Sequence, residues 1–179
     1  MTSYVALLRG INVGGNKMVA MAELRAMLED LGFSDVKTLL QSGNAVFRGP
    51  VKAPATLERQ LEAAMTRRFN MSCDYHVRTA AELRAVIRAN PLAVEATKDP
   101  SRFVVGFYRE PLDTSLVKAA QAAITGPEIV RADGRHLYMY YPNGQGTSKA
   151  GIVVGKMLKV QGTARNWNTV LKLGALAGE

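Results

Sequence analysis

A glycine-rich polar loop is the stretch of this sequence whose residue types could most directly do chemistry. Arg9–Lys17 contains three glycines and two asparagines between an arginine and a lysine. Glycine accepts positive φ and allows close approach to the backbone, so main-chain N–H groups of such a loop could hold an anion. A long turn without a ligand explains the same residues. The candidate anion-binding residues of the loop are Arg9, Asn12, Gly14, Gly15 and Asn16.

The loop lacks the residues of a nucleotide-hydrolysing P-loop. That motif requires G-x-x-x-x-G-K-[ST], in which the lysine and the hydroxyl residue contact phosphate and magnesium. Gly10 and Gly15 have the glycine spacing, but Asn16 stands where the lysine belongs and Lys17-Met18 follows. Hydrolysis of a nucleoside triphosphate is therefore a poor interpretation of this loop.

A second polar turn is expected to lie beside the loop. Gln41, Ser42 and Asn44 surround Gly43 between two strand-like runs. The strands that precede the loop and the turn are predicted to run parallel, because a helix connects them. Loop and turn then meet at one end of a sheet, and these three polar residues join the candidate anion-binding set. In the rival interpretation Arg9 bonds carbonyls of the turn and the whole arrangement is a structural clasp.

A third polar cluster opens the last predicted helix. Arg165 and Asn168 are a second pair of candidate contact residues, directed toward a ligand or another chain. Trp167, the only tryptophan, falls on the apolar side of the same helix with Val170 and Leu171. That spacing favours packing in the core.

The remaining reactive side chains are assigned to structure. Cys73 is the only cysteine, which excludes an internal disulfide, and its strand parity predicts a buried thiol. His76 and His136 do not cluster with it, so no metal site is expected, and both histidines are predicted to be exposed on strands. Ser42 lacks the surrounding residues of a nucleophile elbow. No cofactor is predicted, and the sequence leaves open whether the protein is an enzyme.

The apolar periodicity predicts the elements that position these residues. Residues 3–78 follow the order strand, helix, strand, strand, helix, strand, which is the ferredoxin-like unit. The pattern restarts at Arg102 with a strand, a helix and a hairpin around Asp133-Gly134. A weaker helix follows, and Thr163 then leads into an extra C-terminal helix in place of a clear final strand.

The predicted fold class is therefore α+β, with two ferredoxin-like (βαββαβ-type) halves from a diverged duplication and an extra C-terminal helix. Residues 1–78 form the first half in this prediction. Residues 79–101 form a connecting helix and a linker, and residues 102–179 form the second half with the C-terminal helix.

The charge balance favours anionic partners. Lysine and arginine exceed aspartate and glutamate by 23 to 15, a net charge of +8. Nucleic acid or a small anionic ligand is the expected partner. No apolar run approaches the ~20 residues that span a bilayer, and the start lacks the pattern of a secretory signal. A bacterial-type cytoplasmic protein with no membrane partner is expected, and the sequence does not decide its oligomeric state.

Three motifs in order resemble a widespread bacterial family that is catalogued as a domain of unknown function. They are the strand and loop Tyr4–Gly15, the turn Gln41–Asn44 and the C-terminal segment Thr163–Leu173. The resemblance covers essentially the whole chain. It implies two related ferredoxin-like halves and no particular reaction. One departure is Lys149–Gly155, where extra glycines weaken an expected helix.

Nucleic-acid binding is the leading functional class, because RNA-recognition modules share this sheet topology and the net charge is positive. Those modules stack bases on aromatic residues of their central strands. Against this class, the first strand offers only Tyr4 and the third only Phe47. Phe103, Phe107 and Tyr108 make the second half a slightly better platform, but Phe103 and Phe107 share a face and are expected in the core. One alternative is a binder of, or enzyme for, a phosphorylated metabolite at the loop. The other is a structural or interaction protein without a ligand.

Overall fold

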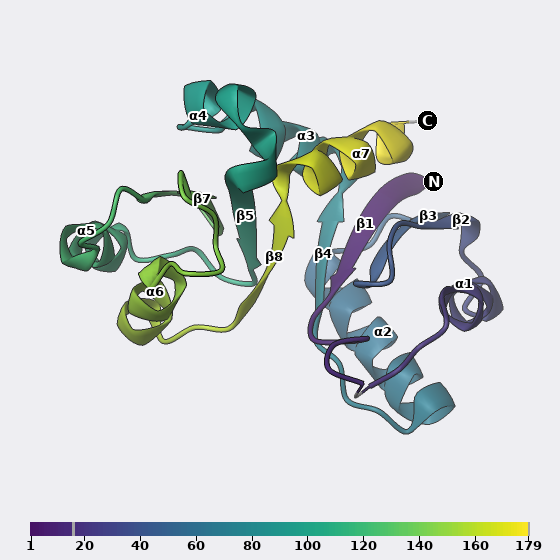
Figure 1. The fold of residues 1–179 in the computed structure, drawn as a ribbon. Helices are drawn as coiled ribbons and strands as arrows, with labels where there is room; N and C mark the ends of the chain where they lie inside the picture. The colour runs from purple at the N-terminus through teal and green to yellow at the C-terminus, as the bar shows by residue number, and fades with distance from the viewer. Residues whose placement is uncertain (16, 179) are drawn as a thin grey trace. The chain divides into compact units, whose positions relative to one another are not determined.

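Two four-stranded antiparallel sheets form the framework of the chain (Figure 1). The computed structural model describes residues 1–15 and 17–178. Its sheets have the strand orders β2-β3-β1-β4 and β6-β7-β5-β8, which are the same arrangement used twice. The predicted α+β fold with two ferredoxin-like halves is confirmed.

The first sheet and its helices are built from the first six elements. In chain order they are β1 (Thr2–Leu8), α1 (Met21–Asp30), β2 (Ser34–Thr38), β3 (Asn44–Gly49), α2 (Pro54–Phe69) and β4 (Tyr75–Thr79). Strand alternation sends Tyr4, Ala6 and Leu8 into one hydrophobic cluster with residues of α1 and α2, such as Leu24 and Leu61. This packing fixes β1, and with it the position of the loop that follows Leu8.

The second sheet repeats the order after three short helices. These elements are α3 (Ala80–Arg88), α4 (Ala93–Lys98), η1 (Pro100–Arg102), β5 (Phe103–Tyr108), α5 (Thr114–Ala123), β6 (Ile129–Asp133), β7 (His136–Tyr140), α6 (Ala150–Leu158), β8 (Gly162–Asn166) and α7 (Trp167–Gly178). The segment expected as connecting helix and linker thus contains α3, α4 and η1. The helix at Lys149–Gly155, weakened by its glycines in the sequence, is formed as α6.

The second half has a fourth strand, so the prediction that Thr163 leads into the C-terminal helix in place of a final strand is wrong. The C-terminal helix itself is formed as α7 and begins at Trp167. β8 pairs antiparallel with β5, and Val105 lies opposite Arg165. The corresponding pair in the first half is Val5 opposite Arg78. β8 escaped prediction because Thr163 and Arg165 are its buried residues, so its alternation is polar and not apolar.

The chain divides into two compact units, and each contains one of the two sheets. The C-terminal residues belong to the unit of the first sheet, although they follow the second sheet in sequence. One unit consists of Met1–Ala85 together with the residues from Lys172 onward, and the other of Val86–Leu171. The two points at which the chain passes between units lie within helices: the first, after Ala85, is in α3, and the second, after Leu171, is in α7. In the described part of the chain, no helix has the length and apolar character needed to cross a bilayer.

Candidate functional site

The glycine loop and the first hairpin turn meet at the end of β1. The backbone N–H of Leu8 donates to the Gly43 carbonyl at 2.9 Å. Asn12 Nδ2 donates to the Gln41 carbonyl at 2.7 Å. These bonds follow from the topology, because β1 and β2 run in the same direction and end at the same side of the sheet.

Asn12 is the residue that ties the loop together. Its Nδ2 also donates to the Val19 carbonyl at 3.0 Å, and its Oδ1 accepts from the Val19 N–H at 2.7 Å. Its own backbone N–H donates to the Lys17 carbonyl at 3.1 Å, which closes the loop. The Asn12 side chain therefore acts as a clasp between the loop, the start of α1 and the turn.

Asn44 has the same role inside the hairpin turn. It is fully buried, and its Nδ2 donates to the Leu39 carbonyl at 2.7 Å and to Ser42 Oγ at 3.1 Å. Gly43 has a φ of +82°, and a Cβ at this position would lie 2.7 Å from Ile11 Cδ1. The turn and the loop are thus packed against each other as well as hydrogen-bonded.

The outer part of the loop is open. Gly14 and Gly15 are exposed and have φ values of +61° and +75°. A Cβ added to either glycine would have no neighbouring atom within 4 Å. Gln41 and Ser42 are exposed on the turn. Asn16, the remaining candidate of the loop, lies outside the described residues.

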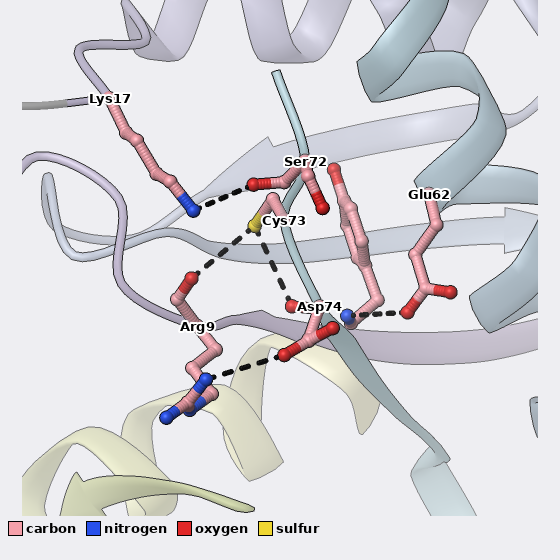
Figure 2. Close-up of polar contacts among 7 residues, drawn as sticks. Arg9, Lys17, Glu62, Ser72, Cys73 and Asp74 are labelled. Carbon is pink, nitrogen blue, oxygen red and sulfur yellow. Dashed lines mark hydrogen bonds and ion pairs between the residues drawn. The ribbon is translucent and has the colours of Figure 1, made fainter. Parts of the chain in front are cut away.

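Two cations flank the open loop, as Figure 2 shows. Arg9 Nη1 lies 3.4 Å from Asp74 Oδ2, and both side chains are about half exposed. Lys17 Nζ donates to the Ser72 carbonyl at 2.8 Å. The segment Ser72–Asp74 thereby holds both cations at one edge of the sheet.

Lys17 and the Ser72–Asp74 segment were not among the predicted site residues. The signal for this segment is topological. β4 pairs antiparallel with β1, with Leu8 opposite Tyr75, so residues just before β4 must lie beside residues just after β1. The Arg9 N–H accordingly donates to the Asp74 carbonyl at 3.0 Å.

Cys73 is a structural thiol, as predicted, although it lies between the residues that hold the cations. It is buried, and its Sγ donates to the Arg9 carbonyl at 3.5 Å. Burial raises the pKa of the thiol from 9.0 to about 11. A thiol with this pKa stays protonated at neutral pH, so it is a poor nucleophile and a poor metal ligand.

In the described residues, no group of three or more histidine, cysteine, aspartate or glutamate side chains is placed to hold a metal ion. His76 was expected to be exposed but is only 2% exposed, because β4 is buried on both faces. His136 is half-buried against the ring of Phe107.

Four aromatic residues of the central strands lie in the interior and are not available for stacking, whereas Tyr108 on β5 is half-buried. Tyr4, Phe47, Phe103 and Phe107 are each 0% exposed. Tyr4 and Phe47 belong to the core cluster beneath α1 and α2, with their ring centroids 5.8 Å apart. Burial of Tyr4 and Phe47 strengthens the argument from the sequence against base stacking on this sheet, and the core assignment of Phe103 and Phe107 is confirmed.

The second candidate pair is split between the interior and the surface. Arg165 is 8% exposed, and its Nη1 donates to Thr163 Oγ1 and to the Ala164 carbonyl. Arg78 holds the equivalent place on β4, 1% exposed, with Nη1 donating to the Val77 carbonyl. A buried arginine on the fourth strand is thus a repeated feature of the two halves. Asn168 is exposed on α7.

The connection from β5 to α5 in the second half corresponds to the connection from β1 to α1 that contains the loop. After β5 the segment Arg109–Asp113 reaches α5 directly, and the Leu112 N–H donates to the Gly134 carbonyl at 2.9 Å. Asp113 caps α5 through the Ser115 N–H, whereas Ala20 gives α1 no side-chain cap. The fold therefore makes this connection with a short segment, and Arg9–Ala20 is longer than the connection requires.

Comparisons with known proteins match the fold and give no activity. The family model described as "Protein of unknown function (DUF1697)" matches residues 1–138. No curated protein matches the chain. A solved structure of the conserved bacterial protein SP0830 from Streptococcus pneumoniae has a TM-score of 0.76 and 27% identity, and the match covers 98% of both chains.

Proposed function

We propose that this chain, which belongs to the DUF1697 family of proteins of unknown function, binds the phosphate backbone of nucleic acid. The binding surface is the loop edge, which we define as the exposed residues around the joined loop and turn: Arg9, Gly14, Gly15, Lys17, Gln41 and Ser42. The proposal includes a location in the bacterial cytoplasm, where nucleic acid is available.

The observation that carries the proposal is the long loop that only the first half possesses. It presents the open backbone of Gly14 and Gly15 between Arg9 and Lys17, while the second half connects the same elements with Arg109–Asp113. The bonds of Asn12 to Gln41, Val19 and Lys17 hold both ends of the loop in place, which lowers the cost of ordering when a ligand binds. Clasp and site are therefore compatible roles of the same segment.

Electrostatics supports a phosphate ligand. The chain carries a net charge of +8. The ion pair of Arg9 with Asp74 is exposed, and exposed pairs contribute only about 0–1 kcal/mol, so the guanidinium can exchange this partner for a phosphate. Arginine offers a planar fork that fits phosphate oxygens, and lysine adds a point charge.

The burial of the central aromatic residues defines the kind of binding. Without Tyr4 and Phe47 on the surface, the sheet cannot read bases by stacking as RNA-recognition modules do. Contacts to phosphate fix position but carry no sequence information. We therefore propose binding with little sequence preference and a strong dependence on salt.

The test is the binding of a labelled oligonucleotide measured by fluorescence anisotropy at several salt concentrations. The double variant Arg9→Ala/Lys17→Ala is expected to bind more weakly. It should also reduce the slope of log K against log salt by roughly 1.4–1.8, as the loss of two phosphate contacts predicts.

The matched control is Arg109→Ala/Arg135→Ala, which removes two cations from the corresponding loop and hairpin of the second half. It is expected to leave the slope close to that of the wild type. An unchanged slope in the Arg9/Lys17 variant, or equal losses in both variants, would contradict the proposal. Binding of inorganic phosphate without any binding of oligonucleotide would instead favour a small anionic ligand.

A further inference from the structure

The loop edge also displays aliphatic side chains that the fold leaves in solvent. Val13, Met18 and Leu40 are 65%, 66% and 56% exposed. Each is the sequence neighbour of a residue in the Asn12 clasp: Val13 of Asn12 itself, Met18 of Val19 and Leu40 of Gln41. The backbone of each apolar residue is thus held next to the junction formed by Asn12, Val19 and Gln41, while its side chain is exposed.

Leu40 is held in a conformation that leucine disfavours. Its φ is +62°, in the left-handed region, where the Cβ of an L-residue is crowded. Glycine or asparagine would fit this turn better, and the exposed Leu40 side chain gains little from burial. A strained conformation at an exposed apolar residue points to a role outside folding.

We infer that Val13, Met18 and Leu40 contact unpaired or unstacked bases while Arg9 and Lys17 hold the neighbouring phosphates. This inference rests on the proposed function and names its substrate class: nucleic acid with single-stranded, bulged or mismatched segments. Aliphatic side chains are known to act as wedges at base steps, and exposed base faces accept apolar contacts whatever their sequence. A fully paired duplex hides those faces, and unstacking it is costly.

The size and charge of the patch favour this occupant over a folded protein. Three side chains cover far less than the ~800 Å² per partner of a stable protein interface. The charged groups beside the patch include the cations Arg9 and Lys17 and the carboxylate of Asp74, which pairs with Arg9. A cationic edge next to apolar side chains matches a polyanion with apolar bases. An anionic lipid surface shares part of this chemistry and is one arm of the test.

The test compares a single-stranded oligonucleotide, a bulged hairpin and a fully paired duplex. We expect the wild type to prefer the first two by about tenfold at equal salt. The double variant Leu40→Gly/Met18→Ser should lose this preference. Its affinity for the paired duplex and its salt slope should equal those of the wild type. Leu40→Gly removes the strained side chain, so the urea midpoint should stay unchanged or rise while the preference falls.

Val51→Ser is the matched control. Val51 is 81% exposed and lies in the segment between β3 and α2. The backbone N–H of its neighbour Lys52 donates to the hydroxyl of Tyr4, near the start of β1. It therefore lies at the other end of β1 from the loop edge, and its substitution should leave the preference intact.

The outcomes separate this inference from the proposed function. If Arg9→Ala/Lys17→Ala weakens all three ligands but Leu40→Gly/Met18→Ser changes no preference, phosphate binding stands and the base contact is overturned. A wild type that binds all three equally also overturns the base contact. Absence of any oligonucleotide binding overturns the proposed function itself. Displacement of the oligonucleotide by anionic phospholipid vesicles, with loss of vesicle binding in Leu40→Gly/Met18→Ser, would assign the apolar side chains to a lipid surface instead.

Discussion

Replacing Trp167 with alanine is expected to lower the free energy of unfolding by about 3–5 kcal/mol. Trp167 is 7% exposed, and its ring packs edge-on against Phe103 with centroids 5.4 Å apart. Phe103 is itself 0% exposed on β5, so removal of the indole leaves a cavity next to a central strand. Chemical denaturation followed by circular dichroism measures the change.

Leu171→Ala on the same helix is the control for this prediction. The sequence placed Leu171 on the apolar side with Trp167, but Leu171 is 41% exposed, whereas Val170 is fully buried. Its loss should cost less than about 1 kcal/mol, as at a partly exposed site. A Trp167→Ala variant with an equally small loss would show that the ring does not anchor the helix.

Replacing Gly43 with alanine is expected to cost about 2–4 kcal/mol, from unfavourable φ together with overpacking. The φ of Gly43 is +82°, and an added Cβ would lie 2.7 Å from Ile11 Cδ1 and 2.8 Å from Leu8 Cβ. The cost measures how tightly the turn is packed against the loop. Urea denaturation of the purified variant provides the value.

Gly134 is the matched position in the hairpin of the second half. Its φ is +52°, but an added Cβ would meet nothing within 4 Å. Gly134→Ala should therefore lower the free energy of unfolding by only about 1 kcal/mol, which is the cost of the positive φ alone. Equal losses at the two glycines would contradict the close packing of loop and turn.

The element order of the first half and the meeting of loop and turn could be predicted from the sequence. Apolar alternation and helical spacing define the elements, and the crossover through α1 forces β1 and β2 to end at the same side. The burial of Trp167 also follows from its spacing with Val170. Each of these conclusions depends on periodicity or on connection rules and needs no side-chain detail.

The polar interior could not be predicted in this way. The side chains of His76 on β4 and Arg165 on β8 are buried. The sequence predicted an exposed strand residue at His76 and the start of a helix at Arg165. Periodicity assigns a charged or polar residue to the surface, because burial of such a group is normally unfavourable. β8 was missed for this reason.

The geometry of the candidate site was partly predictable. The sequence identified Arg9 and the glycines, but it could not distinguish Asn12 as a clasp from Asn12 as a ligand contact, because that depends on which groups its amide reaches. Lys17 was missed because its place is set by Ser72, which is remote in sequence. Antiparallel pairing of β1 with β4 brings the two segments together.

The most direct test of phosphate binding at the loop edge is a titration of the isotope-labelled protein with an oligonucleotide, followed by the NMR amide signals. We predict that the largest shifts fall on Gly14, Gly15, Lys17 and Gln41, and that inorganic phosphate moves the same signals more weakly. The amide signals of Arg109, Leu112 and Gly134 should stay in place, since they belong to the short connection of the second half and to the hairpin turn that it contacts. Shifts centred on that second loop, or none at any residue up to saturating oligonucleotide, would contradict the account.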